Sequence, residues 1–384
     1  MSPGIAATAV TSHETETLST LLSLATLRDP NAHAISYYCS SEPFPDKTHT
    51  HKLTTLDHLL RRVTTDGPTG PDYLTFTNDL THVVTLGEKT SLNSPRFRAI
   101  FACGSQDIWQ EVTLPALVSE CSLEIDRFFR LAPLLRAIQS CEPHCLVLTE
   151  HGKARILMVR GQEIEEIETP LPPIDFRPKS VPGFSHHIEG NLRERSKAFI
   201  HDLIVKIQHV MQEHNCKHLV IGCRKDLWSE LSPQFHKAKL SAMIAGHFHL
   251  PSFEISRGEA LSESHAVMAK DRERFYKTFW EKVQEEPRQF ALGVNSVLNH
   301  LESGRVLQLL LGNLVEAHVS ECADCQAWAI EERTLCSTCG GARVARVPAE
   351  ELILRKALST DVEIFAPEQA TAKQFGQVAA LLRY

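Results

Sequence analysis

Two Cys-x-x-Cys pairs, ten residues apart, constrain this chain more than any other feature. The first pair is Cys322 and Cys325, and the second is Cys336 and Cys339. Each pair brings two thiolates within reach of one ion, and four thiolates complete a tetrahedral zinc site. Such a site has no open coordination position, so the pattern predicts a structural zinc ion rather than a catalytic one. Two disulfide bonds, or a redox-active pair, are the alternatives.

The residues after the last cysteine, Gly340 and Gly341, favour a turn that needs a positive φ. The other cysteines are scattered, and several stand inside apolar runs, where a thiol behaves as a small hydrophobic group. The N-terminus lacks the basic and apolar regions of a secretory signal. No apolar run approaches the length of about 18 residues that a membrane-spanning helix needs. We therefore expect a cytoplasmic protein in a reducing compartment.

The net charge of −7 is unevenly distributed along the chain. Residues 177–240 carry 11 Lys and Arg against 6 Asp and Glu, whereas the rest of the chain is acidic. The whole chain is therefore not a general binder of polyanions, but this short region could bind one. Phosphate-binding and nucleophile-elbow motifs are absent from the sequence.

The 384 residues, of which 42% are hydrophobic, predict three α/β domains with mixed or mostly parallel sheets. We expect a disordered N-terminus over 1–16 and an N-terminal domain over 17–170. A proline-rich linker then leads into a middle domain over 171–287. A C-terminal domain over 288–384 carries the cysteine loop 322–339 as an insertion.

Hydrophobic periodicity predicts the individual elements. Helices are expected at 17–28, 53–63, 123–138, 191–213, 225–231, 262–286, 294–301 and 349–358. Strands are expected at 34–39, 98–103, 110–114, 219–222, 239–245, 306–311, 362–365 and 378–382, with a hairpin over 145–168.

The stretch Gly293–Leu311, the doubled cysteine motif and the C-terminal Leu-Leu-Arg-Tyr together resemble a known family. They are similar to the C-terminal domain of the archaeo-eukaryotic class-1 peptide-chain release factors, whose archaeal members carry a four-cysteine zinc loop there. More narrowly, the chain looks like one of the bacterial families of this superfamily. Relatives of those families include Pelota and the Balon-type hibernation factors.

The resemblance also implies where a catalytic motif should lie. Family members hydrolyse peptidyl-tRNA with a Gly-Gly-Gln loop at the start of the middle domain, which corresponds here to the segment after Pro182. Residues 183–195 contain no Gly-Gly-Gln, and the chain also lacks the Asn-Ile-Lys-Ser motif of stop-codon readers. The resemblance therefore implies a release-factor-like protein without the hydrolytic motif.

In the segment after Pro182, basic residues are the one part of the family pattern that is present. Arg193, Arg195 and Lys197 stand at the predicted start of a helix, beside an expected loop with His186 and His187. We expect these five residues to contact the phosphates of ribosomal RNA or of a tRNA acceptor end. A solvated helix face is the alternative, although cations at a helix N-terminus oppose its dipole.

We therefore expect a ribosome-binding protein that acts in ribosome rescue or hibernation without peptidyl-tRNA hydrolysis. Its expected partners are the ribosome, with a tRNA or a translational GTPase, and neither a membrane nor DNA. One alternative is a diverged hydrolase that uses His186, His187 or Glu189, although no nucleophile accompanies them. Another alternative is a protein-interaction module that does not bind the ribosome. The pairs His49/His51 and His247/His249 are interpreted as polar residues at strand ends.

Overall fold

A computed structural model describes residues 12–29, 33–40, 73–88, 97–116, 122–150, 152–167, 185–314 and 316–383. Within these ranges, the side chains of 12–18, 40, 73, 87–88, 185–193 and 369 are not described. The chain divides into two compact units. The middle unit comprises Met1–His13 and Glu142–Phe275, and the terminal unit comprises Glu14–Cys141 and Tyr276–Tyr384.

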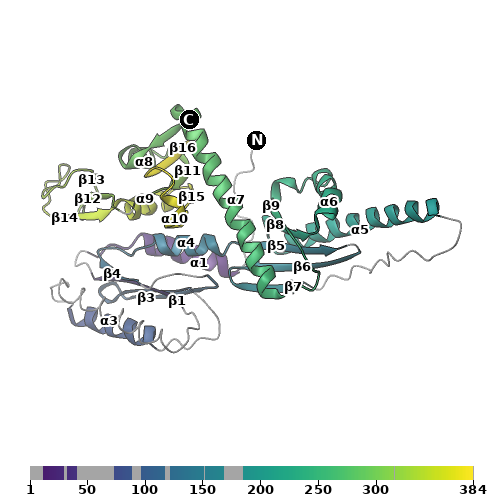
Figure 1. The fold of residues 1–384 in the computed structure, drawn as a ribbon. Helices are drawn as coiled ribbons and strands as arrows, with labels where there is room; N and C mark the ends of the chain where they lie inside the picture. The colour runs from purple at the N-terminus through teal and green to yellow at the C-terminus, as the bar shows by residue number, and fades with distance from the viewer. Residues whose placement is uncertain are drawn as a thin grey trace. The chain divides into compact units, whose positions relative to one another are not determined.

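The middle unit is built on a five-stranded sheet with the order β7-β6-β5-β8-β9 (Figure 1). Strands β5, β6 and β7 form two antiparallel hairpins, whereas β8 and β9 continue the sheet parallel to β5. The strands span His144–Glu150 (β5), Lys153–Arg160 (β6), Glu163–Ile167 (β7), His218–Cys223 (β8) and Ile244–His249 (β9).

Helices cover both faces of this sheet. One face packs against α5 (Ser185–Glu213) and α6 (Lys225–Lys237), and the other packs against α7 (Arg257–Glu285). The apolar side chains of α5 recur at helical spacing from Phe199 to Met211, and they are buried against the sheet. This periodicity is why the C-terminal half of α5 docks on the sheet.

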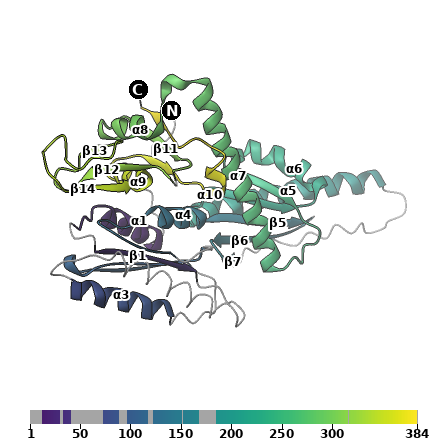
Figure 2. The ribbon, with the colours of Figure 1, turned by 60° about the vertical axis from the view of Figure 1, so that its left-hand side comes forward.

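The terminal unit contains an antiparallel sheet near the N-terminus with the order β3-β2-β1-β4. Alternate residues of β1 point to opposite faces, so Ile35 and Tyr37 pack with α3 while Ala34 and Tyr38 face α1 and α4. Figures 1 and 2 show these helices on the two sides of the sheet. The elements span Ser12–Ala25 (α1), Ala34–Ser40 (β1), Tyr73–Glu88 (α3), Phe97–Cys103 (β2), Ile108–Leu114 (β3), Ser122–Asp126 (β4) and Ala132–Ser140 (α4).

The C-terminal part of the same unit holds two further sheets. A mixed sheet has the order β10-β16-β11-β15, and a small antiparallel sheet has the order β13-β12-β14. The small sheet lies in the chain between β11 and α9, as predicted for the cysteine insertion. The elements span Phe290–Leu292 (β10), Gly293–Glu302 (α8), Val306–Leu311 (β11), His318–Cys322 (β12), Trp328–Ala329 (β13), Val344–Pro348 (β14), Ala349–Leu358 (α9), Glu363–Phe365 (β15), Gln369–Ala372 (α10) and Val378–Leu382 (β16).

One hydrophobic core joins the N-terminal and C-terminal parts of the terminal unit. Within this core, the buried carboxylate of Glu351 on α9 contacts the start of α4. Glu351 accepts hydrogen bonds from the backbone N–H groups of Leu131 and Ala132, at 2.9 and 3.1 Å. These N–H groups belong to the first turn of α4, where they lack a partner within the helix. Glu351 therefore caps a helix more than 200 positions away in the sequence.

Several sequence expectations need correction. The terminal unit's N-terminal sheet is antiparallel rather than mixed or mostly parallel, because alternation of helices and strands does not fix strand direction. The hairpin at 145–168, confirmed as β5–β7, pairs through β5 with β8. It thus shares a sheet with residues that the sequence analysis placed across the boundary at 170. Residues 12–16, expected to be disordered, lie in α1.

One helix prediction failed and one helix was missed, both for local reasons. The expected helix 123–138 is instead β4 followed by α4, because Pro133 cannot lie inside a helix and stands at the start of α4. Helix α3 was missed, although Phe76, Leu80 and Val83 recur at helical spacing, because β-branched residues are frequent in it. The expected helix 53–63 and the pair His49/His51 lie outside the described residues. Among the described residues, no helix combines the length and the apolarity needed to cross a bilayer.

Candidate functional site

The four cysteines converge on one point at the edge of the small sheet β13-β12-β14. Their Sγ atoms all lie within 4.8 Å of one another. Cys322 and Cys339 are 3.7 Å apart at Sγ, and Cys325 and Cys336 are 3.5 Å apart. Sulfur atoms around a tetrahedral zinc ion, each about 2.3 Å from the metal, are separated by about 3.8 Å. The cluster therefore fits one metal ion held by four thiolates.

The two Cys-x-x-Cys turns have the same backbone geometry. In the first turn the N–H of Gln326 donates to the carbonyl of Cys322 at 2.9 Å, and in the second the N–H of Gly340 donates to Cys336 at 3.0 Å. Both donors have a left-handed conformation, with φ of 60° and 73°. The predicted positive φ is thus confirmed for Gly340. At Gly341 space is the constraint instead, since a Cβ there would lie 2.5 Å from Asp324 Oδ2.

Electrostatics at the cluster favour a bound cation. Backbone N–H groups of Cys339 and Thr338 point at Cys336 Sγ and lower the pKa of that thiol to about 6. The backbone N–H of Ala327 also favours the thiolate of Cys325, yet the neighbouring sulfur atoms outweigh it and raise the pKa of Cys325 to about 12. Four thiolates this close repel one another, and a divalent cation reverses that repulsion. Among the described residues, this is the one group of cysteine, histidine and carboxylate side chains arranged to hold a metal.

The segment expected to replace the Gly-Gly-Gln loop is helical from Ser185. Arg193, Arg195 and Lys197 therefore lie in the third and fourth turns of α5, too far from its N-terminus for its dipole to act on them. Arg195 and Lys197 are exposed, and the buried face of α5 begins only at Phe199. Figures 1 and 2 both show this half of α5 extending beyond the sheet. The side chains of His186, His187 and Arg193 are outside the described residues.

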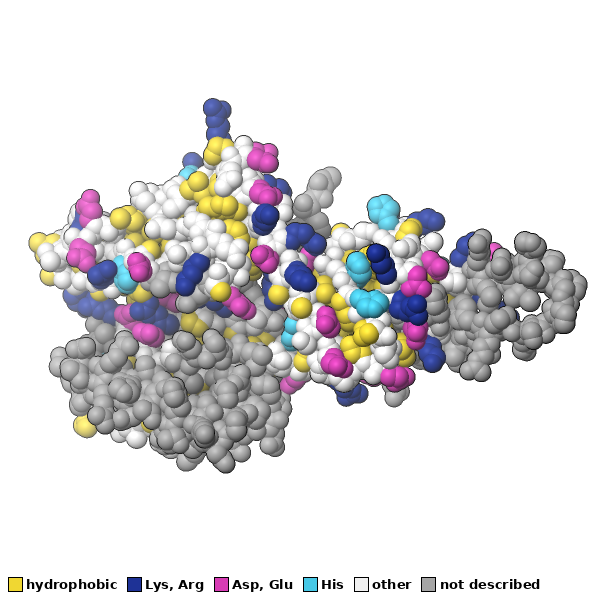
Figure 3. All heavy atoms as spheres, in the orientation of Figure 1, with side chains coloured by type: hydrophobic (Ala, Val, Ile, Leu, Met, Phe, Trp, Pro, Cys, Tyr) yellow, Lys and Arg dark blue, Asp and Glu magenta, His cyan; other side chains and the backbone are white. Residues whose placement is uncertain are grey.

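Further basic residues accompany α5 on the same unit. Arg224 and Lys225 at the start of α6, and His236 and Lys237 at its end, are exposed. His247, at the end of β9 as predicted, stacks on Trp228 of α6 with ring centroids 4.1 Å apart. Figure 3 shows histidine, lysine and arginine side chains gathered over this region. Helix α6 begins where the sequence predicted a helix over 225–231 and continues to Lys237, and all its residues fall within the basic stretch 177–240.

A protein-family model matches a segment that contains most of the middle unit and α4 of the terminal unit. Residues 130–269 match the bacterial archaeo-eukaryotic release factor family 10. This segment is about a third of the chain, and over it the chain is similar to that family. The segment contains the sheet β5–β9, α5 and α6, and it confirms the bacterial family resemblance seen in the sequence. No curated protein matches the chain.

Solved structures of translation factors are similar to the chain over most of its length. An archaeal translation termination factor, aRF1, is 14% identical, with a TM-score of 0.26, and the match covers 97% of this chain and 98% of that one. A ribosome-bound archaeal Pelota is 12% identical, with a TM-score of 0.37, over 96% and 94% of the two chains. Dom34 from S. cerevisiae, a translation termination-like factor that interacts with Hbs1, is 11% identical with a TM-score of 0.36, over 76% and 80%.

The segment 130–269 also contains a buried histidine, His144, that the sequence analysis did not identify, with the partly buried His218 and His265 near it. His144, on β5, is 3% exposed, and its Nε2 lies 3.2 Å from the hydroxyl oxygen of Ser264 on α7. Burial, with a smaller contribution from His265, lowers the pKa of His144 to about 4. Nearby, His218 Nε2 lies 3.2 Å from Glu142 Oε1, and this contact raises the pKa of His218.

We expect acid to destabilise the middle unit through His144. Between pH 6.5 and about 4, His144 takes up a proton in the unfolded chain but not in the folded one, so stability falls as the pH falls. The full effect is about 3 kcal/mol. His218 opposes it, because its raised pKa contributes stability below pH 6.5 that is lost as the pH rises. Urea unfolding at pH 7 and pH 4.5 should show a smaller acid loss in His144→Gln than in the parent. An equal loss in both would contradict the assignment.

Proposed function

We propose that this chain binds the ribosome through α5, with its exposed residues Arg195 and Lys197, and acts in rescue or hibernation without hydrolysing peptidyl-tRNA. The observation that carries this proposal is the segment 183–197. It stands where the release-factor resemblance requires a catalytic Gly-Gly-Gln loop, and it has neither the motif nor its glycine pair. Without that loop, a release-factor-like protein retains binding surfaces but no group to activate water at the ester.

The geometry of α5 supports an RNA contact. Its 29 residues correspond to a helix of about 43 Å at 1.5 Å per residue. The part from Phe199 onwards packs on the sheet, whereas Arg195 and Lys197 are exposed on the half of the helix that extends beyond the sheet (Figure 1). Cations held away from the body of a protein can reach phosphates in a groove, and such contacts supply most of the sequence-independent affinity for RNA. The exposed basic residues of α6 extend the same charge.

Zinc is the metal that we propose for the four cysteines. All-thiolate tetrahedral sites favour zinc over hard cations such as magnesium or calcium. Cys322, Cys325, Cys336 and Cys339 would hold the ion, which would stabilise the small sheet without an open position for substrate. In this proposal the metal centre shapes the C-terminal part of the protein, and the contact with RNA lies elsewhere.

Reversing the charges of Arg195 and Lys197 on α5 should abolish ribosome binding. In Arg195→Glu/Lys197→Glu, two phosphate contacts become two repulsions, so we expect at least a hundredfold weaker binding to purified ribosomes. The single change Lys197→Ala should weaken binding to a smaller degree and lower the dependence of log K on log salt by about one. Co-sedimentation through sucrose at several salt concentrations measures both effects.

The matched control is Lys270→Glu, since Lys270 is an exposed cation on α7 of the same unit. It should bind as the parent does. Parent protein that never co-sediments with ribosomes, or a double variant that binds as well as the control, would refute the proposal. Release of peptide from loaded ribosomes, lost in His187→Ala, would instead favour the hydrolase alternative.

A further inference from the structure

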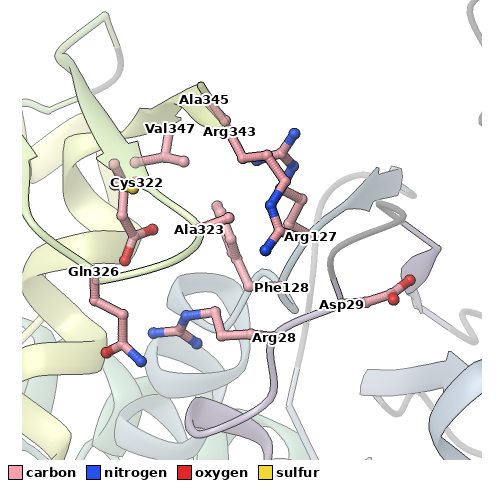
Figure 4. Close-up of a pocket in the computed structure, with 11 residues that line it drawn as sticks. Arg28, Asp29, Arg127, Phe128, Cys322, Ala323, Gln326, Arg343, Ala345 and Val347 are labelled. Carbon is pink, nitrogen blue, oxygen red and sulfur yellow. The ribbon is translucent and has the colours of Figure 1, made fainter. Parts of the chain in front are cut away.

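A cavity of about 220 Å³ lies in the terminal unit between its N-terminal part and the zinc-loop sheet (Figure 4). One wall comes from the chain after α1 and after β4, with Arg28, Arg127 and Phe128. The opposite wall comes from the first cysteine turn and from β14, which contributes Ala345 and Val347. A single buried water needs only about 15 Å³, so the cavity can take a polyatomic ligand.

Arginine side chains in this cavity have donors without acceptors. Among the described residues, neither Nε of Arg28 nor one terminal nitrogen of Arg127 has a hydrogen-bond partner, and both atoms are buried. Such N–H groups cost free energy unless an acceptor reaches them. Burial and the charge of Arg355 lower the pKa of Arg28 to about 10. This places two guanidinium groups in a partly dry environment, where each has a strong preference for an anion.

The carboxylates nearby are engaged in other contacts. Glu321 forms an ion pair with the buried Arg355 at 2.9 Å, and Asp29 accepts a hydrogen bond from the backbone N–H of His33 at 2.7 Å. In Figure 4 the Asp29 side chain points away from the cavity, whereas the Arg28 guanidinium points toward the amide of Gln326. Arg343, at the rim, is paired with Asp324. Three arginines against two carboxylates leave the lining with a positive charge.

We propose that this cavity is a binding site for a phosphate group, held by Arg28 and Arg127 from one wall. The planar guanidinium fork matches phosphate oxygens and gives strong, charge-assisted hydrogen bonds. Phe128, Ala345 and Val347 line the remaining space with apolar surface. The phosphate is either the free ion or the phosphate of a small ester, whose organic part would lie on that apolar surface. This cavity is separate from Arg195 and Lys197 of α5, and phosphate binding to it does not depend on ribosome binding.

Isothermal titration of the zinc-loaded full chain with inorganic phosphate, and separately with adenosine 5′-monophosphate, tests the site. We expect saturable binding of at least one probe, weakened about tenfold or more in Arg127→Gln. Tighter binding of the ester than of phosphate would assign the ligand as a phosphate ester, and the reverse would assign it as the free ion. The control is Arg346→Gln, because Arg346 lies on β14 but does not line the cavity.

A second measurement distinguishes binding from a structural role. Without ligand, Arg127→Gln should melt at the same temperature as the parent or higher, since it removes a buried donor that has no acceptor. Arg28→Gln should also lose phosphate binding. Because this change also removes hydrogen bonds to the carbonyls of Ala25 and Leu27, it could prevent folding. If Arg28→Gln fails to fold, the result for Arg127→Gln alone tests the proposal. Absence of saturable binding of both probes, or equal binding by Arg127→Gln and Arg346→Gln, would overturn the proposal.

Discussion

Removing the proposed zinc ion, or one of its four cysteine ligands, should unfold the small sheet β13-β12-β14 while the rest of the terminal unit stays folded. The three strands have only five, two and five residues, so the sheet cannot bury a core of its own. In structural zinc sites the free energy of metal binding, about 10–16 kcal/mol in isolated zinc-finger peptides, is the free energy of folding. Cys325→Ser, which leaves three thiolates, should therefore lose most of its metal.

Metal analysis and amide hydrogen exchange measure this loss. In the parent we expect one zinc ion per chain and slow exchange at Gln326 and Gly340, the N–H donors of the two cysteine turns. Both N–H groups should exchange faster by orders of magnitude in Cys325→Ser or after strong chelation. Cys141→Ser, a half-buried cysteine outside the cluster, serves as the control. Full metal retention in Cys325→Ser, or unchanged exchange after chelation, would show that the site does not stabilise this sheet.

Glu351→Ala should lower the free energy of unfolding of the terminal unit by about 3 kcal/mol. Glu351 is 3% exposed and accepts two N–H groups at the start of α4. Burial raises the pKa of its carboxyl, and the N–H groups of Leu131 and Ala132 oppose that rise by favouring the carboxylate. Truncation leaves both donors buried without an acceptor and opens a cavity. Urea unfolding, followed by hydrogen exchange in α4, measures the change.

Two variants bracket this result. Glu351→Gln keeps one acceptor oxygen and should lose less stability than Glu351→Ala. Glu331→Ala removes an exposed carboxylate paired with a half-exposed arginine, and should change stability by less than 1 kcal/mol. If Glu351→Ala and Glu331→Ala unfold at the same urea concentration, the cap between α9 and α4 does not contribute to stability.

The sequence predicted those elements whose signals are local. The strands 306–311 and 378–382 and the helix 349–358 lie as expected, because each is a continuous apolar run or a clear helical period between turn residues. The hairpin 145–168 was equally clear. Pro133 is a local signal for the start of α4. The spacing of Phe76, Leu80 and Val83 is a local signal for α3, although the many β-branched residues of this helix lower its helix propensity.

Partners that are distant in sequence could not be predicted in this way. Nothing in the residues around Glu351 indicates that it caps a helix beginning at Ala132, and nothing near Arg28 indicates that it shares a cavity with Arg127 and Val347. Likewise, the pairing of β5 with β8 spans some 70 residues of chain. Such contacts depend on how whole elements pack, and a single sequence without related sequences has no pattern that encodes them.

By itself, the sequence determined the four-cysteine cluster, the resemblance to bacterial release-factor families and the absence of Gly-Gly-Gln, because ligand spacing and motifs are properties of a few neighbouring residues. The tertiary structure decided which strands share a sheet, where α5 leaves the sheet to expose Arg195 and Lys197, and which arginines face a common cavity. The physical reason is that burial and charge environment are set by neighbours in space. Those neighbours exist only once the chain has folded.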